Sequence, residues 1–142
     1  MKRSRMRAIS KKRRELNMAV RPIREQMIIK AQDCMVCGHS PKRPWPNMPA
    51  EMSVLACHEI ARGPLRSKAL DKAYACLVAC WKCNSGILND KGTWPEARQL
   101  AVLLHEAPED FDLAAYIKLT SPQAPKRITM DEVSAWWTQM YR

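Results

Sequence analysis

The stretch "ACLVACWKCNSG" at residues 75–86 decides the fold, because a short apolar run leads directly into a CxxC pair, Cys80 and Cys83. A second CxxC pair, Cys34 and Cys37, lies upstream, with 42 residues between the two pairs. Each tight CxxC turn can present two thiolates to one ion, and two such turns complete a tetrahedral site of four sulfurs. A site of this kind has no open coordination position, so we expect a structural Zn²⁺.

The remaining cysteines and the start of the chain agree with a metal rather than a disulfide. The basic N-terminus runs into further charge instead of an apolar signal segment, which favours a soluble protein in a reducing compartment. A redox dithiol would need a thioredoxin-like βαβ pattern, which the sequence lacks. His39 and Cys76 are alternative zinc ligands, although Cys57 and Cys76 fit better as small buried apolar side chains. The apolar run around 73–81 is too short to cross a membrane.

Positive charge is concentrated at the N-terminus. Residues 1–30 hold 11 Lys or Arg and 2 Glu, whereas the rest of the chain is nearly balanced, within a formal total of +10. Such an arm suits the phosphate backbone of DNA or RNA, and its densest part is Lys11, Lys12, Arg13 and Arg14. The alternative is a solvated tail that only aids solubility.

The expected elements describe an α+β fold that is mostly helical. Capping and periodicity predict a helix at about 10–31 that Pro22 kinks or divides in two. Apolar and β-branched residues predict a strand at 53–60, and a second short strand or an extended turn leads into a helix near Cys83. Three C-terminal helices follow: two begin at S/T-x-x-E capping boxes, at Thr93 and Thr129, and one spans 108–120.

These elements suggest three segments. Residues 1–31 form a basic N-terminal arm, 32–92 a zinc-stapled core, and 93–142 a C-terminal helical extension.

Between the two CxxC pairs lies "LACHEIARG", residues 55–63, in which His58 and Glu59 are adjacent titratable residues near the end of an apolar strand. A single histidine in this position is more often a packed residue than a ligand. Here the His-Glu pair is accompanied by Asn84, which follows the last cysteine of the quartet. Asn84 has an alternative role as a helix N-cap, and the two roles are compatible.

The order "CMVC", "HEI", "CWKCN" resembles the HNH (ββα-metal) endonuclease family. It is similar in layout to small phage and prophage members with a four-cysteine zinc site, including the endonuclease VII type of recombination nuclease. The resemblance covers about 34–90, and the basic arm also resembles what such phage proteins carry. It implies a small ββα core and a phosphodiester hydrolase that acts on DNA in recombination or processing, in the cytoplasm of a bacterial host.

Carried over to this chain, the resemblance places a catalytic divalent cation, Mg²⁺ or Mn²⁺, on His58 and Asn84. Glu59 stands where the family usually has its general-base histidine, which leaves two assignments open. Either His58 binds the cation and Glu59 activates water, or the two exchange roles. Neighbouring strand residues point to opposite faces, so both serve one site only if the strand bends.

Further basic residues are candidates for DNA contacts. Arg62 could steady a phosphate through a bidentate contact, and Lys82 and the N-terminal arm could hold the flanking backbone. The resemblance also leaves a homodimer open. The rival interpretation is a non-catalytic, zinc-stapled nucleic-acid-binding protein in which His58, Glu59 and Asn84 are structural.

Overall fold

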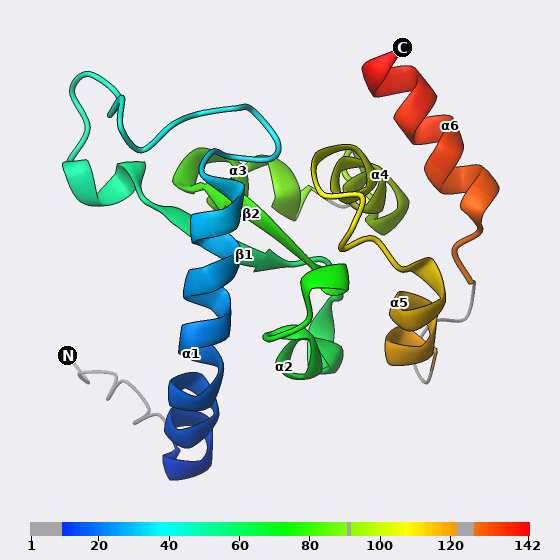
Figure 1. Cartoon of the computed structure of the whole chain (residues 1–142), viewed down its shortest axis with the longest axis horizontal. Coiled ribbons are helices and arrows are strands. Elements are labelled where there is room, and N and C mark those ends of the chain that lie inside the picture. The colour runs from blue at the N-terminus through cyan, green and yellow to red at the C-terminus, as the bar shows by residue number, and fades with distance from the viewer. Residues whose placement is uncertain (1–9, 91, 122–126) are drawn as a thin grey trace, which may run out of the picture.

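Two short antiparallel strands lie at the centre of the structure, a computed structural model that describes residues 10–90, 92–121 and 127–142 (Figure 1). The fold is α+β and mostly helical, as expected. In chain order, its helices and strands are α1 (Lys11–Ala31), β1 (Leu55–Glu59), α2 (Arg66–Ala69), β2 (Cys76–Cys80), α3 (Trp81–Ser85), α4 (Glu96–Glu106), α5 (Leu113–Thr120) and α6 (Met130–Tyr141).

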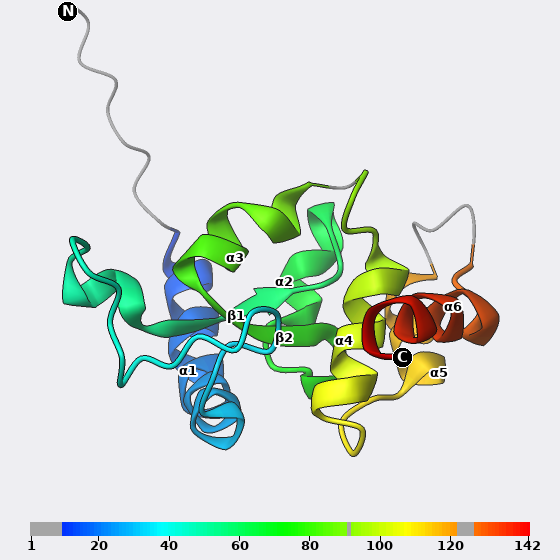
Figure 2. The same ribbon diagram turned by 90° about the horizontal axis from the view of Figure 1, so that it is seen from above.

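The sheet is covered by helices. β1 pairs with β2 so that His58 lies opposite Leu77 and Glu59 opposite Cys76. Every residue of β2 is buried, because helices lie on both sides of the strands: α1 contacts β1 and β2, and α4 contacts β2 from the opposite side (Figure 2). The predicted strand at 53–60 is confirmed with narrower bounds, and the predicted second strand is β2.

Helix α1 begins as predicted, with the Ser10 Oγ accepting a hydrogen bond from the Arg13 N–H at 3.2 Å. We expected Pro22 to kink this helix or to divide it, but α1 is a single helix of 21 residues, so the division is wrong. Pro22 is exposed, and its missing N–H removes one hydrogen bond of the helix. Contacts of Met27 and Ile28 with the core stabilise the helix beyond the proline.

One of the two predicted capping boxes is present. At α6 the Thr129 Oγ1 accepts from the Glu132 N–H at 3.2 Å, as predicted. At α4 the prediction is wrong, because Pro95 is the N-cap residue. The Thr93 hydroxyl instead donates to the Asp90 carboxylate at 2.8 Å, since this nearer acceptor lies in the preceding turn.

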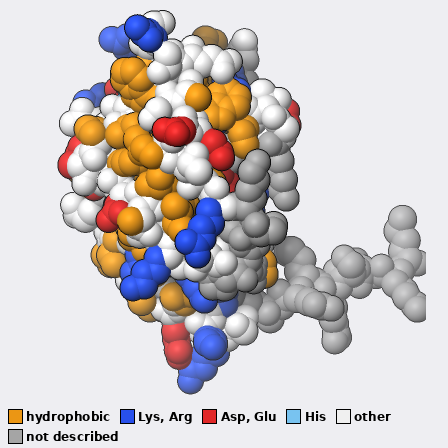
Figure 3. All heavy atoms as spheres, turned by 90° about the vertical axis from the view of Figure 1, so that its right-hand side faces the viewer, with side chains coloured by type: hydrophobic (Ala, Val, Ile, Leu, Met, Phe, Trp, Pro, Cys, Tyr) orange, Lys and Arg blue, Asp and Glu red, His pale blue; other side chains and the backbone are white. Residues whose placement is uncertain are grey.

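The C-terminal helices belong to the same core as the sheet. One cluster of buried side chains extends from Cys34 to Val133, and α4 lies between β2 and α6. Arg98 stacks between two indoles, 3.9 Å from the Trp94 ring and 5.0 Å from the Trp136 ring. Both Trp136 and its neighbour Trp137 are partly buried against the core. Apolar side chains are also visible on the outer face of this region (Figure 3).

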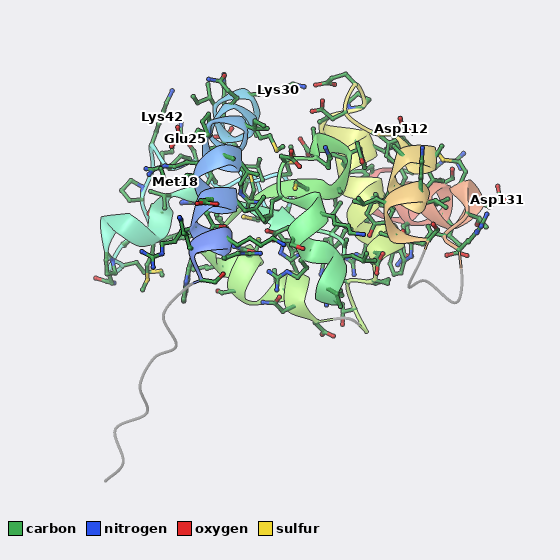
Figure 4. The ribbon with its side chains drawn as sticks, turned by 90° about the horizontal axis from the view of Figure 1, so that it is seen from below. Met18, Glu25, Lys30, Lys42, Asp112 and Asp131 are labelled. Carbon is green, nitrogen blue, oxygen red and sulfur yellow. The ribbon has the colours of Figure 1, made fainter. Side chains whose placement is uncertain are left out.

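Glu25 on α1 and Lys42 in the following loop lie at one end of the molecule, whereas Asp112 and Asp131, at the N-termini of α5 and α6, lie at the other (Figure 4). None of the helices in the described part of the chain has the length and apolarity to cross a bilayer. The segment "SPQAP" at 121–125, whose two prolines are typical of a linker, lies mainly outside the described residues.

Candidate zinc site and candidate active site

Four cysteine thiols meet beside the sheet. The sulfurs of Cys34, Cys37, Cys80 and Cys83 all lie within 4.8 Å of one another, and those of Cys37 and Cys80 are 3.6 Å apart. In a tetrahedral Zn²⁺ site with Zn–S bonds of about 2.3 Å, neighbouring sulfurs are separated by about 3.8 Å. The quartet predicted from the sequence therefore has the spacing and the chemistry of a structural metal site.

Backbone hydrogen bonds position the first CxxC turn against the second strand. Gly38 has a φ of +77°, which only glycine adopts readily, and its N–H donates to the Cys34 carbonyl at 2.9 Å. The Met35 N–H donates to the Val78 carbonyl at 2.9 Å. A metal ion in the quartet would thus join the segment after α1 to β2 and α3.

The thiols differ in how readily they ionise. Burial opposes ionisation of Cys34, but backbone N–H groups from Cys37, Cys80 and Val36 outweigh it and lower its pKa. Burial raises the pKa of Cys37 to about 11, and the charge of Cys34 adds to the effect. Cys34 thus ionises more readily than an ordinary thiol, whereas the full set of four thiolates needs a cation to offset the mutual repulsion.

The alternative zinc ligands lie outside the quartet. The His39 ring stacks on Trp45 at 3.7 Å between centroids. The Cys76 thiol donates to the Ala69 carbonyl at 3.1 Å, and burial raises its pKa to about 12. Cys57 is buried against α1, where its thiol lies 3.7 Å from the Arg24 carbonyl oxygen. Cys57 and Cys76 thus occupy the buried apolar positions expected of them.

His58 and Asn84 are brought together by the strand–strand–helix unit beside the quartet. The His58 Nδ1 lies 3.0 Å from the Asn84 Oδ1, although the two residues are 26 positions apart. Asn84 is inside α3, whose N-cap residue is Cys80, so the alternative role of Asn84 as an N-cap is wrong. Helix α3 also begins at Trp81, earlier than predicted, which places Asn84 on its last turn.

Gln99 on α4 completes the surroundings of His58 and was missed in the sequence. Its Oε1 lies 3.1 Å from the His58 Nε2, and the Gln99 side chain is fully buried. Burial lowers the pKa of His58 below its ordinary value, against the opposing effect of the Asn84 and Gln99 contacts. The available signal was the stretch "EARQLAVLL", in which a polar Gln interrupts the apolar face of a helix. A buried amide needs partners, and this one finds them at the site.

Glu59 lies beside His58 in sequence but has different partners. Its carboxylate accepts from Arg24 of α1 at 3.2 Å and from Arg66 of α2 at 3.4 Å. Glu59 is 9% exposed, and the Arg66 side chain is 60% exposed. A cavity of about 180 Å³ touches both His58 and Glu59. The strand alternation thus separates the contacts of the two residues, while both still line one cavity.

The predicted DNA-contacting residues divide into two groups. The Arg62 Nη2 donates to the backbone carbonyls of Leu88 and Trp94 at 3.0 and 3.3 Å, so part of this guanidinium stabilises the fold. The remaining candidates are exposed: Lys11, Lys12, Arg13 and Arg14 on α1, and Lys82 on α3, whose ammonium lies 4.4 Å from the centre of the Trp45 ring.

Gly86, two residues after Asn84, has no room for a side chain. A Cβ there would lie 2.8 Å from the Lys82 carbonyl oxygen, so Gly86→Ala is expected to lower the free energy of unfolding by about 1–3 kcal/mol. Urea denaturation measures this loss. Gly92→Ala is the matched control, because its Cβ would meet only the Asp90 carboxylate at 3.5 Å. Equal stabilities for the two variants would contradict the prediction.

Comparisons with known proteins leave the family open. The chain matches no protein-family model, no curated protein and no solved structure. The cysteine quartet and the polar groups around His58 are therefore the features of the chain that point to a function.

Proposed function

We propose that the protein is a metal-dependent endonuclease of the HNH type that hydrolyses DNA phosphodiester bonds. The observation that carries the proposal is the 3.0 Å approach of the His58 Nδ1 to the Asn84 Oδ1, beside a four-thiol cluster. The order β1, β2, α3 supports it, because the resemblance to HNH nucleases implies a ββα core with these ligands. Processing of phage or prophage DNA is the corresponding biological role.

The donor atoms suit a divalent cation. An imidazole nitrogen and an amide oxygen are both ligands for Mn²⁺, and the oxygen also suits Mg²⁺. When bound, such a cation neutralises charge that develops on the phosphate. The cavity of about 180 Å³ beside His58 is also lined by Glu59, Arg62 and Arg66, and it has room for water or a phosphate oxygen next to the histidine.

Glu59 is the candidate general base, and its ion pairs control its availability. Arg24 and Arg66 each donate to this carboxylate, so two guanidinium groups occupy part of the acceptor sites that an attacking water would need. Arg66 is the more exposed partner, and a phosphate entering the cavity would compete with Glu59 for its guanidinium. Substrate binding would thereby free one carboxylate oxygen. In the exchanged assignment, His58 accepts the proton and Glu59 holds the cation.

Asn84→Ala is expected to lower the rate of DNA cleavage by at least about 10–100-fold, since the loss of even an outer-shell partner of a metal costs this much. The assay uses zinc-loaded protein, plasmid duplex and a four-way junction, with Mg²⁺, Mn²⁺ or no divalent cation. Ser85→Ala is the control, because Ser85 is the next residue on α3, is exposed, and bonds only the Trp81 carbonyl. Cleavage by Asn84→Ala at the wild-type rate would contradict the proposed site.

A second candidate function is non-catalytic binding of nucleic acid. It is favoured by the complete engagement of the polar groups: both ring nitrogens of His58 face amide oxygens, and Glu59 pairs with two arginines. The exposed lysines and arginines of α1 would still bind phosphates. DNA binding that weakens steeply with salt, without cleavage of either substrate in any cation, would select this function.

A further inference from the structure

The buried amide of Gln99 has only one orientation that satisfies its neighbours. Its Nε2 lies 3.0 Å from the Trp94 carbonyl oxygen and 3.5 Å from the Leu88 carbonyl oxygen. Carbonyl oxygens only accept hydrogen bonds, so the NH₂ group must face them. The Gln99 Oε1 is then the atom directed at the His58 Nε2, 3.1 Å away.

We infer that Gln99 is a positioning residue that keeps neutral His58 in the tautomer with its proton on Nε2. The Gln99 oxygen can only accept, so the nitrogen facing it must donate. Nδ1 is left with its lone pair directed at the Asn84 Oδ1. Histidine ligands of metals commonly donate their other ring N–H to a carbonyl in this way, which fixes the ring and the tautomer.

The same two carbonyls anchor Arg62, which makes the arrangement of Gln99 more rigid. The Arg62 Nη2 donates to the carbonyls of Leu88 and Trp94. These two carbonyls therefore join the Arg62 guanidinium, from the loop after β1, and the Gln99 amide, from α4, in one hydrogen-bond network. Gln99 is fully buried, so water cannot easily replace its hydrogen bonds to the carbonyls of Leu88 and Trp94. The tautomer of His58 is thus set by α4, a helix outside the strand–strand–helix unit.

The consequence at the other nitrogen rests on the proposed function. With the proton on Nε2, two lone pairs face each other across 3.0 Å, on Nδ1 and on the Asn84 Oδ1. A cation between the two side chains would relieve this repulsion, as would rotation of the Asn84 amide by half a turn. Gln99 therefore prepares Nδ1 for a metal ion instead of a proton.

The tautomer can be read directly from the ¹⁵N chemical shifts of the histidine rings. The chain has three histidines, so the His58 signals are assigned from a His58→Gln spectrum. Spectra of zinc-loaded protein are recorded without other divalent cations, above about pH 8, where the ring is neutral. Wild type is expected to carry the proton on Nε2. A predominantly Nδ1-protonated wild type would overturn the inference.

Variants of Gln99 test the cause. Gln99→Met removes the acceptor at similar volume and is expected to shift His58 toward the Nδ1–H form. Gln99→Glu, which can still accept, is expected to retain the Nε2–H form. If His58 keeps its proton on Nε2 in Gln99→Met, then Gln99 does not set the tautomer.

Cleavage provides the second measurement, and it separates this inference from the proposed function. Gln99→Met is expected to reduce cleavage by about 10–100-fold at unchanged zinc content. If wild type cuts no substrate but His58 is Nε2-protonated and responds to Gln99, the nuclease proposal fails and the positioning role of Gln99 stands. If wild type cuts DNA but His58 is Nδ1-protonated, only the positioning role fails.

Discussion

Removal of zinc from the cysteine quartet is expected to abolish the cooperative fold of the central segment. Structural Zn²⁺ contributes an apparent binding free energy of about 10–16 kcal/mol in small zinc-binding peptides. A whole domain of ordinary stability has an unfolding free energy of only about 5–15 kcal/mol. Here the quartet connects the turn after α1 to β2 and α3, and three of its four cysteines are buried. Without the ion, the turn after α1 would be held against β2 and α3 by its few backbone and apolar contacts with the short two-stranded sheet.

The measurement is thermal unfolding, followed by circular dichroism and tryptophan fluorescence, with and without a strong chelator. Metal content is determined in parallel by mass spectrometry. Cys80→Ser removes one fully buried ligand and is expected to reproduce the effect of the chelator. Cys76→Ser is the matched control, since Cys76 is also buried in β2 but lies outside the quartet. A metal-free wild type that unfolds at the same temperature as the zinc-loaded protein would contradict this prediction.

The cysteine quartet was predictable because its signal is local. A CxxC spacing presents two sulfurs from one turn whatever the rest of the chain does, so two such pairs need only a connection that lets them meet. The apolar runs that became β1 and β2, and the Ser10 cap of α1, are local signals of the same kind. Pro22 shows the limit of such signals. Its local preference is outweighed by tertiary contacts of α1, which no short pattern reveals.

The surroundings of His58 and Glu59 depend on contacts between distant segments. Gln99 is 41 residues from His58, and Arg24 is 35 residues from Glu59. In the sequence, nothing shows which of the chain's arginines and glutamines contact Glu59 and His58, so only the fold identifies Arg24 and Gln99 as these partners. The pairing of His58 with Asn84 was expected from the resemblance to HNH nucleases. The engagement of Glu59 by two arginines was not.

Arg24→Met is expected to lower the free energy of unfolding by up to about 3–5 kcal/mol, the usual cost of breaking a buried ion pair, because only the more exposed Arg66 would still pair with Glu59. Arg24 donates to the Glu59 carboxylate at 3.2 Å and to the carbonyls of Leu70 and Cys57 at 3.0 and 2.8 Å. Its side chain is 22% exposed and that of Glu59 only 9%. The same contacts dock the basic helix α1 onto β1, so the variant should also expose α1 to proteolysis.

Arg21→Met is the matched control, one turn earlier on the same helix. Its pair with Glu25 is 78% and 57% exposed, and such a pair contributes only about 0.3–0.5 kcal/mol. Urea denaturation compares the two variants with the double variant Arg24→Met/Glu59→Gln. The double variant should recover part of the loss, because the neutral amide is less costly to bury without a cation. Equal losses for Arg24→Met and Arg21→Met would mean that Glu59 does not depend on Arg24. Arg66 would then be the partner that a phosphate must displace before Glu59 acts as the base.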